Sequence, residues 1–142
     1  MWNTATDLEI ITNWKHLRTN ISCLDLDSQI AQTIKFISSI PYGSRTIDYY
    51  TPDSWPTPWE ILAHRQFCTS SISLLAYYTI TMVSDADISL HLVDDGDDVY
   101  LLPEINNKFL NYYPNDLVNR AELAEEIEIL KTYTRDSLKP VR

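Results

Sequence analysis

The sequence predicts a single α+β domain over residues 1–142, and three observations support that fold class. Apolar residues recur at helical spacing through the first third of the chain. Residues 88–93 instead alternate with a period of two, which is typical of a strand. The length of 142 residues, with 44% hydrophobic and 22% charged residues, is ordinary for one folded domain.

Two N-terminal helices and a long loop are expected first. Thr6-Asp7 can cap a helix over about residues 7–18, whose apolar side chains lie three or four positions apart. Asp27-Ser28 is a second start signal, and the helix that follows should stop at Pro41. The next segment, residues 44–56, is rich in proline and aromatic residues, which disfavour both a helix and a central strand.

A central helix is predicted to begin at Pro58. Thr57 stands at the N-cap, Pro58 at the first helical position and Glu60 three residues past the cap, which is the pattern of a capping box. The helix either runs unbroken to Met82 or pauses near Cys68. Three hydroxyl residues follow Cys68, and since each can cap a new helix, they favour the break.

A three-stranded antiparallel meander and a C-terminal helix complete the expected fold. The first strand reverses at an acidic turn around Gly96 into a return strand over residues 99–105. A third strand is expected over residues 108–113. Asn115 or Asp116 then caps a helix through about Tyr133, with Leu123, Ile127 and Leu130 facing inward at helical spacing, and acidic residues come early and basic residues late in this segment.

Charge and composition exclude several classes of protein. The chain has 11 Lys and Arg against 20 Asp and Glu, so its net charge is −9, and no basic cluster is present; a nucleic-acid partner is not expected. The longest weakly polar run, residues 72–83, is too short to span a membrane. Two cysteines and the absence of an export leader indicate a reducing, cytoplasmic setting, in the host cytoplasm or a virion if the protein is viral.

No cofactor or metal is expected from the motifs. The sequence has no glycine-rich phosphate loop, and its cysteines and histidines do not have zinc-site spacing. The acidic turn, residues 94–98, lacks the loop spacing and the distal Glu of an EF-hand, so we interpret it as a solvated hairpin tip.

Three residues have the order that nucleophilic catalysis by cysteine requires. Such catalysis needs a thiolate, a base that forms it and a group that orients the base. Backbone N–H groups at a helix N-terminus favour an anionic sulfur, and Cys68 stands just before the expected helix start. His91 follows on the first strand, and Glu104, Asn106 or Asn107 follows after the turn.

The segment from Trp55 to Glu104 resembles the core of the transglutaminase-like (papain-like) cysteine proteins. The resemblance covers about a third of the chain and rests on Trp-Pro-Thr-Pro-Trp-Glu, Phe-Cys-Thr-Ser-Ser-Ile-Ser-Leu-Leu, Leu-His-Leu-Val-Asp-Asp-Gly and Tyr-Leu-Leu-Pro-Glu. It implies a cysteine that starts a helix packed on an antiparallel sheet, with a histidine on one strand and an aspartate on the next, in whose place this chain has a glutamate. By this resemblance Cys68 is the nucleophile, His91 the base and Glu104 the orienting acid.

The register of the hairpin decides whether that triad can form. If Asp94 pairs with Val99, Glu104 lies one diagonal step from His91, about 7 to 8 Å between Cα atoms, and its carboxylate can reach the imidazole. If Asp94 pairs with Asp97, the separation is roughly 13 Å and the triad cannot include Glu104. The sequence leaves both registers open.

Each candidate residue also has a structural interpretation. A buried free cysteine such as Cys68 is commonly a small core residue, and His91 can be a histidine on the polar face of a strand. His64 competes for the role of base, because it lies four residues before Cys68 on the same face if the helix is continuous.

Two main classes of function therefore remain, and a third, an acidic mimic of nucleic acid, ranks below them because the negative charge is spread along the chain. The first is a cysteine-dependent amide or ester hydrolase or acyltransferase, active or inactive. The second is a non-catalytic interaction or assembly protein, such as a viral (phage) structural or accessory subunit, in which an oligomer is possible. Its protein partner is expected to bind through four aromatic residues that otherwise cover the core as a lid: Tyr49, Tyr50, Trp55 and Trp59.

Overall fold

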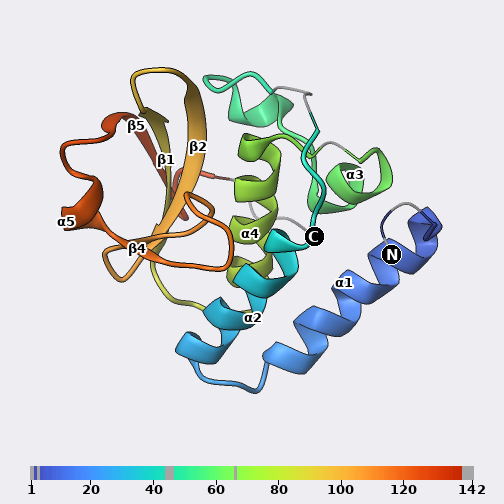
Figure 1. Cartoon of the computed structure of the whole chain (residues 1–142). Coiled ribbons are helices and arrows are strands. Elements are labelled where there is room, and N and C mark those ends of the chain that lie inside the picture. The colour runs from blue at the N-terminus through green and yellow to red at the C-terminus, as the bar shows by residue number, and fades with distance from the viewer. Residues whose placement is uncertain (1, 3, 44–46, 66, 139–142) are drawn as a thin grey trace.

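The computed structural model describes all residues except 1, 3, 44–46, 66 and 139–142, and it confirms the α+β fold class. The described residues form five α-helices, one 3-10 turn and one five-stranded sheet (Figure 1). The helical elements are α1 (Asp7–Ile21), α2 (Leu26–Ser38), the 3-10 turn η1 (Pro52–Ser54), α3 (Pro58–Ala63), α4 (Thr69–Val83) and α5 (Arg120–Leu123). The strands are β1 (Ile88–Asp94), β2 (Val99–Ile105), β3 (Lys108–Phe109), β4 (Val118–Asn119) and β5 (Glu128–Thr134).

The sheet is antiparallel throughout, with the strand order β4-β3-β2-β1-β5. Helices α1 to α4 lie on one side of it, while α5 lies on the other side (Figure 1). Helix α4 is the centre of the molecule, because every residue from 70 to 80 is buried between the sheet and the other helices. A larger core on the α4 side and a smaller one on the α5 side hold the two layers to the sheet.

Local capping signals account for the helix boundaries. Thr6 and Thr57 each close the capping box with the Glu three residues later, as expected for α1 and α3. Helix α2 begins slightly earlier than predicted, because Asp25 rather than Asp27-Ser28 accepts the capping bond from the backbone of Ser28. The break between α3 and α4 is confirmed, and Cys68 is the N-cap of α4.

The predicted C-terminal helix through Tyr133 is wrong. The chain instead forms β4, the short α5 and then β5, which pairs along the free edge of β1. Ile129 is opposite Val93 and Lys131 is opposite Leu92, so Leu130 has no partner in β1 and forms a bulge. Leu123 is buried but Leu130 is 41% exposed, so the apolar residues at helical spacing in this segment do not form one buried face.

The third strand is also shorter than predicted, because it ends at Phe109 rather than continuing to residue 113. Asn111 has a left-handed backbone with φ of 67°, a conformation that ends a strand and that asparagine adopts more readily than most residues. Its side-chain amide donates to the carbonyl of Thr69 at 3.1 Å and to Ser73 Oγ at 2.9 Å. This contact ties the segment after β3 to the first turns of α4.

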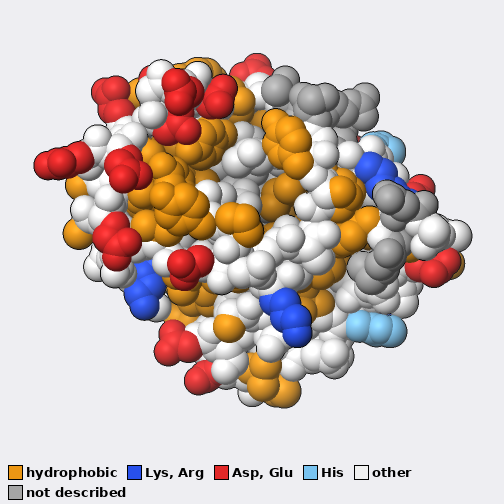
Figure 2. Space-filling model, in the orientation of Figure 1, with side chains coloured by type: hydrophobic (Ala, Val, Ile, Leu, Met, Phe, Trp, Pro, Cys, Tyr) orange, Lys and Arg blue, Asp and Glu red, His pale blue; other side chains and the backbone are white. Residues whose placement is uncertain are grey.

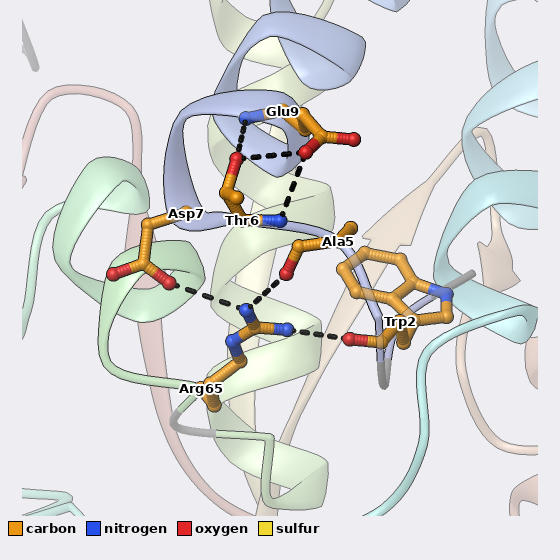
Figure 3. Close-up of polar contacts among 6 residues, drawn as sticks. All are labelled: Trp2, Ala5, Thr6, Asp7, Glu9 and Arg65. Carbon is orange, nitrogen blue, oxygen red and sulfur yellow. Dashed lines mark hydrogen bonds and ion pairs between the residues drawn. The ribbon is translucent and has the colours of Figure 1, made fainter.

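Arg65 holds the N-terminal segment against the turn between α3 and α4 (Figure 3). Its guanidinium donates from Nη1 to the carbonyl of Trp2 at 2.7 Å and from Nη2 to the carbonyl of Ala5 at 2.9 Å. Asp7 forms an ion pair with it at 3.2 Å. Arg65 has a φ of 55°, so this clasp holds a backbone conformation that costs an L-residue energy.

Candidate functional site around Cys68

The Cys68 side chain caps α4 and is 5% exposed. Its sulfur accepts a hydrogen bond from the backbone N–H of Ser71 at 3.4 Å, and the thiol lies 3.2 Å from Ser71 Oγ, to which it can donate. The neighbouring Ser70 hydroxyl accepts from the backbone N–H of Leu101 at 3.0 Å. The start of α4, and the sulfur with it, is therefore fixed against β2.

His91 and Glu104 lie together in the register that allows their contact. Asp94 is paired with Val99, and His91 Nε2 lies 2.7 Å from Glu104 Oε1. The other ring nitrogen, Nδ1, lies 2.8 Å from the hydroxyl of Thr132 on β5. Both ring nitrogens therefore have partners on the sheet.

Arg120 completes this polar cluster from α5. Its Nη1 donates to Glu104 Oε1 at 2.8 Å, and the Glu104 side chain is 9% exposed. Glu104 Oε2 is buried and has no hydrogen-bond partner among the described residues. The carboxylate is held between an imidazole and a guanidinium, the arrangement that a buried negative charge needs for stability.

The side chains of Cys68 and His91 belong to opposite sides of the sheet. Leu90 and Leu92, the neighbours of His91, belong to the large core that contains α4. Successive side chains of a strand point to opposite faces, so His91 faces away from α4. Its ring centroid lies 5.8 Å from that of Phe109, a residue of the smaller core on the α5 side. The structure thus joins two of the three expected catalytic residues and leaves Cys68 apart from them.

The other two histidines of the sequence do not supply a base in place of His91. His16 is an exposed residue of α1. His64 is the exposed C-cap of α3, and because the helix breaks after it, His64 and Cys68 do not share a helix face. The sequence contains three histidines, and none of them lines the cavity next to Cys68.

A cavity of about 360 Å³ lies beside Cys68 at the N-terminus of α4. Four tyrosines, one carboxylate and the start of α4 form its wall, which we call the tyrosine cleft. Its lining residues are Tyr42, Tyr49, Cys68, Thr69, Ser70, Asp98, Val99, Tyr100, Asn111 and Tyr112.

Two phenols of the tyrosine cleft, those of Tyr100 and Tyr112, stay protonated at neutral pH. Burial raises the pKa of Tyr100, and its hydrogen bond to the Asp95 carboxylate at 3.0 Å raises it further. Burial also raises the pKa of Tyr112, with a second contribution from its hydrogen bond to Glu126 at 3.2 Å. These two hydroxyls can bind a ligand by hydrogen bonds, but as neutral phenols they do not act as bases.

The carboxylates of the β1–β2 turn have two different environments. Asp95 Oδ1 accepts from the backbone N–H groups of Asp98 at 2.7 Å and Asp97 at 2.9 Å, and these bonds lower the pKa of Asp95. Asp95 therefore stabilises the turn. The exposed Asp98 carboxylate receives no hydrogen bond or ion pair from the described residues, and Asp98 lines the cleft. It places an uncompensated negative charge at the wall.

The four aromatic residues expected to contact a partner are divided between the core and the surface. Trp55 is 8% exposed, donates to the carbonyl of Asp48 and packs edge-on against Tyr133, so it covers the core. Trp59 packs edge-on against Trp14. Only Tyr50, at 59% exposure, is fully on the surface, and the half-buried Tyr49 lines the tyrosine cleft.

The fold is similar to that of solved structures of LapG from Legionella pneumophila, a transglutaminase-like cysteine protease. The calcium-bound LapG structure has a TM-score of 0.72 and 12% identity, with 92% of this chain and 77% of that chain covered. A second LapG structure has a TM-score of 0.73 and 13% identity over 89% and 75% of the two chains. The EGTA-treated LapG structure has a TM-score of 0.72 and 12% identity over 89% and 73%.

The chain therefore has the transglutaminase-like fold that the segment from Trp55 to Glu104 resembles. No protein-family model and no curated protein matches the sequence. One LapG structure contains calcium, but among the residues described for this chain no group of three or more His, Cys, Asp or Glu is placed to hold a metal ion. Within the same residues, no helix is both long and apolar enough to span a bilayer.

Sequence reasoning missed several residues of the two polar sites. Tyr100, Asn111 and Tyr112 were assigned only to strands, although Asn111 precedes two tyrosines and a proline, a composition typical of a turn. Arg120 and Thr132 were placed on a helix, so their contacts with Glu104 and His91 were not foreseen. No local signal identifies those contacts: Thr132 reaches His91 through the pairing of β5 with β1, and Arg120 is brought to Glu104 by the pairing of β4 with β3 and of β3 with β2.

Proposed function

We propose that the protein is a non-catalytic binding domain built on the transglutaminase-like fold, and that its tyrosine cleft holds a segment of a partner protein. The proposal depends on one observation above all. Both ring nitrogens of His91 are bonded on the side of the sheet that faces away from α4, so Cys68 has no imidazole beside it. Without a base to take the thiol proton, the sulfur lacks the second member of a cysteine nucleophile pair.

The composition of the cleft supports binding. Its wall combines aromatic rings, neutral hydroxyls and a carboxylate, and tyrosine is among the commonest anchors of protein interfaces. Of the aromatic residues expected to hold a partner, Tyr49 lies in the cleft wall and Tyr50 is exposed, so these two belong to the proposed surface. The two tryptophans support the surface from below, through their contacts with the core.

A cysteine-dependent hydrolase or acyltransferase is the second candidate. It is favoured by the position of Cys68, which caps a helix and lines a cavity, as the nucleophile of the resembled family does. In this alternative a group other than His91 has to accept the thiol proton. The two candidates therefore differ in one measurable property, the reactivity of the Cys68 sulfur and its dependence on histidine.

Thiol alkylation by iodoacetamide tests the proposal. Cys23 is a second, exposed free thiol, so the measurement is made in a Cys23→Ser background. We expect Cys68 to react more slowly than a cysteine in a short peptide, because its sulfur is buried. We also expect His91→Gln to leave the rate at about pH 6 unchanged, since glutamine can still bond Glu104 and no imidazole assists the sulfur.

His64→Gln and His16→Gln are matched controls that each remove one exposed histidine. A fast reaction at about pH 6 that His91→Gln or His64→Gln slows, with His16→Gln unchanged, would overturn the proposal and favour the hydrolase. Partial unfolding of a variant would accelerate alkylation rather than slow it, so the two effects have opposite signs.

A further inference from the structure

We infer that the tyrosine cleft binds the cationic side chain of a basic peptide segment, an arginine or a lysine. This inference rests on the proposed function, because it names the chemistry of the segment that the binding domain holds. Three features of the cleft support it: the aromatic wall, the unpaired carboxylate and the charge of the surrounding surface.

The aromatic wall is suited to a cation. Aromatic rings attract ammonium and guanidinium groups through the negative potential of their faces, and several rings around one cavity form a cage for such a group. Four of the lining residues are tyrosines. Since the pKa of Tyr100 and of Tyr112 is raised, both rings keep their hydroxyl protons and present neutral phenol oxygens as hydrogen-bond acceptors.

Asp98 supplies the charge that pairs with a cation. It lines the cleft, and no described residue donates a hydrogen bond to its carboxylate or forms an ion pair with it. Asp95 is occupied in the turn and in the bond to Tyr100, so it holds the backbone that presents Asp98. The role of Asp98 is therefore separable from the folding of the turn.

The surrounding surface excludes the opposite charge. Among the described residues no Lys or Arg lines the cleft, and the full chain carries a net charge of −9. Acidic side chains gather over the β1–β2 end of the molecule beside a patch of hydrophobic side chains (Figure 2). A basic segment is the peptide chemistry that this combination of charge and aromatic surface complements.

Binding of a short acetylated glycine-serine peptide with one central arginine tests the inference. The reference peptide has glutamine in place of arginine, and binding is followed by chemical-shift changes of the ¹⁵N-labelled full chain at physiological ionic strength, where non-specific attraction is screened. We expect the arginine peptide to shift the amides around the cleft, and the glutamine peptide to bind at least about fivefold more weakly.

A matched pair of variants separates the cleft from the overall charge. Asp98→Asn and Asp85→Asn remove the same charge from exposed positions at opposite ends of β1. We expect Asp98→Asn to weaken binding at least about fivefold and Asp85→Asn less than about twofold. Tyr42→Ala, a change at a 73% exposed side chain that leaves the core intact, is expected to weaken binding as well.

Equal weakening by the two Asp variants, or equal binding of the two peptides, would overturn the inference. The alkylation experiment is independent of these results. If Cys68 is unreactive and the arginine peptide fails to bind, the inference fails while the non-catalytic assignment stands. If Cys68 proves to be activated by a histidine, the proposed function itself fails.

Discussion

The backbone conformation of Arg65 predicts that glycine at this position makes the protein more stable than alanine does. At most helical and extended positions Gly is less stable than Ala by about 0.5 to 1 kcal/mol. Arg65 has a φ of 55°, where the cost to an L-residue is about 1 to 2 kcal/mol and glycine avoids it. We therefore expect Arg65→Gly to be more stable than Arg65→Ala by about 1 kcal/mol.

Both variants also lose the contacts of the guanidinium. Its bonds to the carbonyls of Trp2 and Ala5 are charge-assisted, and each contributes about 1 kcal/mol once the 34% exposure of the side chain is taken into account. The ion pair with Asp7 is solvated and adds little. Arg65→Ala is thus expected to lower the free energy of unfolding by about 2 to 3 kcal/mol, and Arg65→Gly by about 1 to 2 kcal/mol.

Urea unfolding followed by tryptophan fluorescence measures this order, because Trp2 packs on Phe36 and Phe67 and is released when the segment detaches. The difference between the two variants corresponds to roughly 3 °C in Tm for a domain of this size. An alanine variant as stable as the glycine variant would refute the reasoning, because the backbone at residue 65 would then not hold a left-handed conformation.

Three further predictions concern the buried polar groups and the helix cap. Glu104→Ala should lower the free energy of unfolding by about 3 kcal/mol, because the Glu104 side chain is buried. Arg120→Met should lower it by about 1 kcal/mol or less, because the Arg120 side chain is 50% exposed. Thermal unfolding measures both changes. The buried indole N–H of Trp14 donates to the hydroxyl of Thr79 at 2.9 Å. Thr79→Val removes this acceptor and should lower the free energy of unfolding by about 1 to 3 kcal/mol. An unchanged Tm would contradict this prediction. The backbone N–H of Thr57, and then its hydroxyl, lower the pKa of Glu60 in the folded protein. The ionised Glu60 therefore stabilises the fold above the ordinary Glu pKa, and this stabilisation is lost as the pH falls through the lower pKa of the folded state. The urea midpoint should accordingly decline less steeply on acidification in Glu60→Gln than in the parent protein.

The first four helices were predictable because their signals are local. A capping box joins residues three positions apart, so Thr57 and Glu60 define the start of α3 whatever the rest of the chain does. The break before α4 was favoured for the same reason, since hydroxyl residues cluster where a new cap is needed. The hairpin of β1 and β2 is also local, and its two ends are separated only by the acidic turn.

The C-terminal third was not predictable from local pattern, because its structure is decided by a distant strand. Leu123, Ile127 and Leu130 have helical spacing, yet Ile129 pairs with Val93 and Tyr133 with Leu90 of β1, at sequence separations of 36 and 43. Pairing with β5 supplies hydrogen-bond partners to the backbone groups on the outer edge of β1, which would stay unpaired if residues 128–134 formed a helix. Non-local pairing thus overrides a weak helical period.

Cys68 lies apart from His91 and Glu104, and the alternation of side chains along β1 explains why. His91 lies between Leu90 and Leu92, and if those two leucines pack under α4, the histidine must face the opposite side. The order of cysteine, histidine and acid along the chain does not determine on which face of the sheet each side chain lies. The His91–Glu104 contact expected in one of the two registers was confirmed, and it serves a buried cluster with Arg120 rather than the sulfur.

The same alternation predicts where an imidazole would reach Cys68. Val99 begins β2 and lines the tyrosine cleft together with Cys68, so Val99→His places a base on the correct side of the sheet. We expect this variant, in the Cys23→Ser background, to raise the alkylation rate at about pH 7 by about tenfold, which is less than the roughly 10²-fold or more that a fully positioned base contributes. Val99→Asn is the matched polar control and should leave the rate unchanged. An equal rate in both variants would contradict the prediction, because the missing imidazole would then not be what separates this cleft from a cysteine nucleophile.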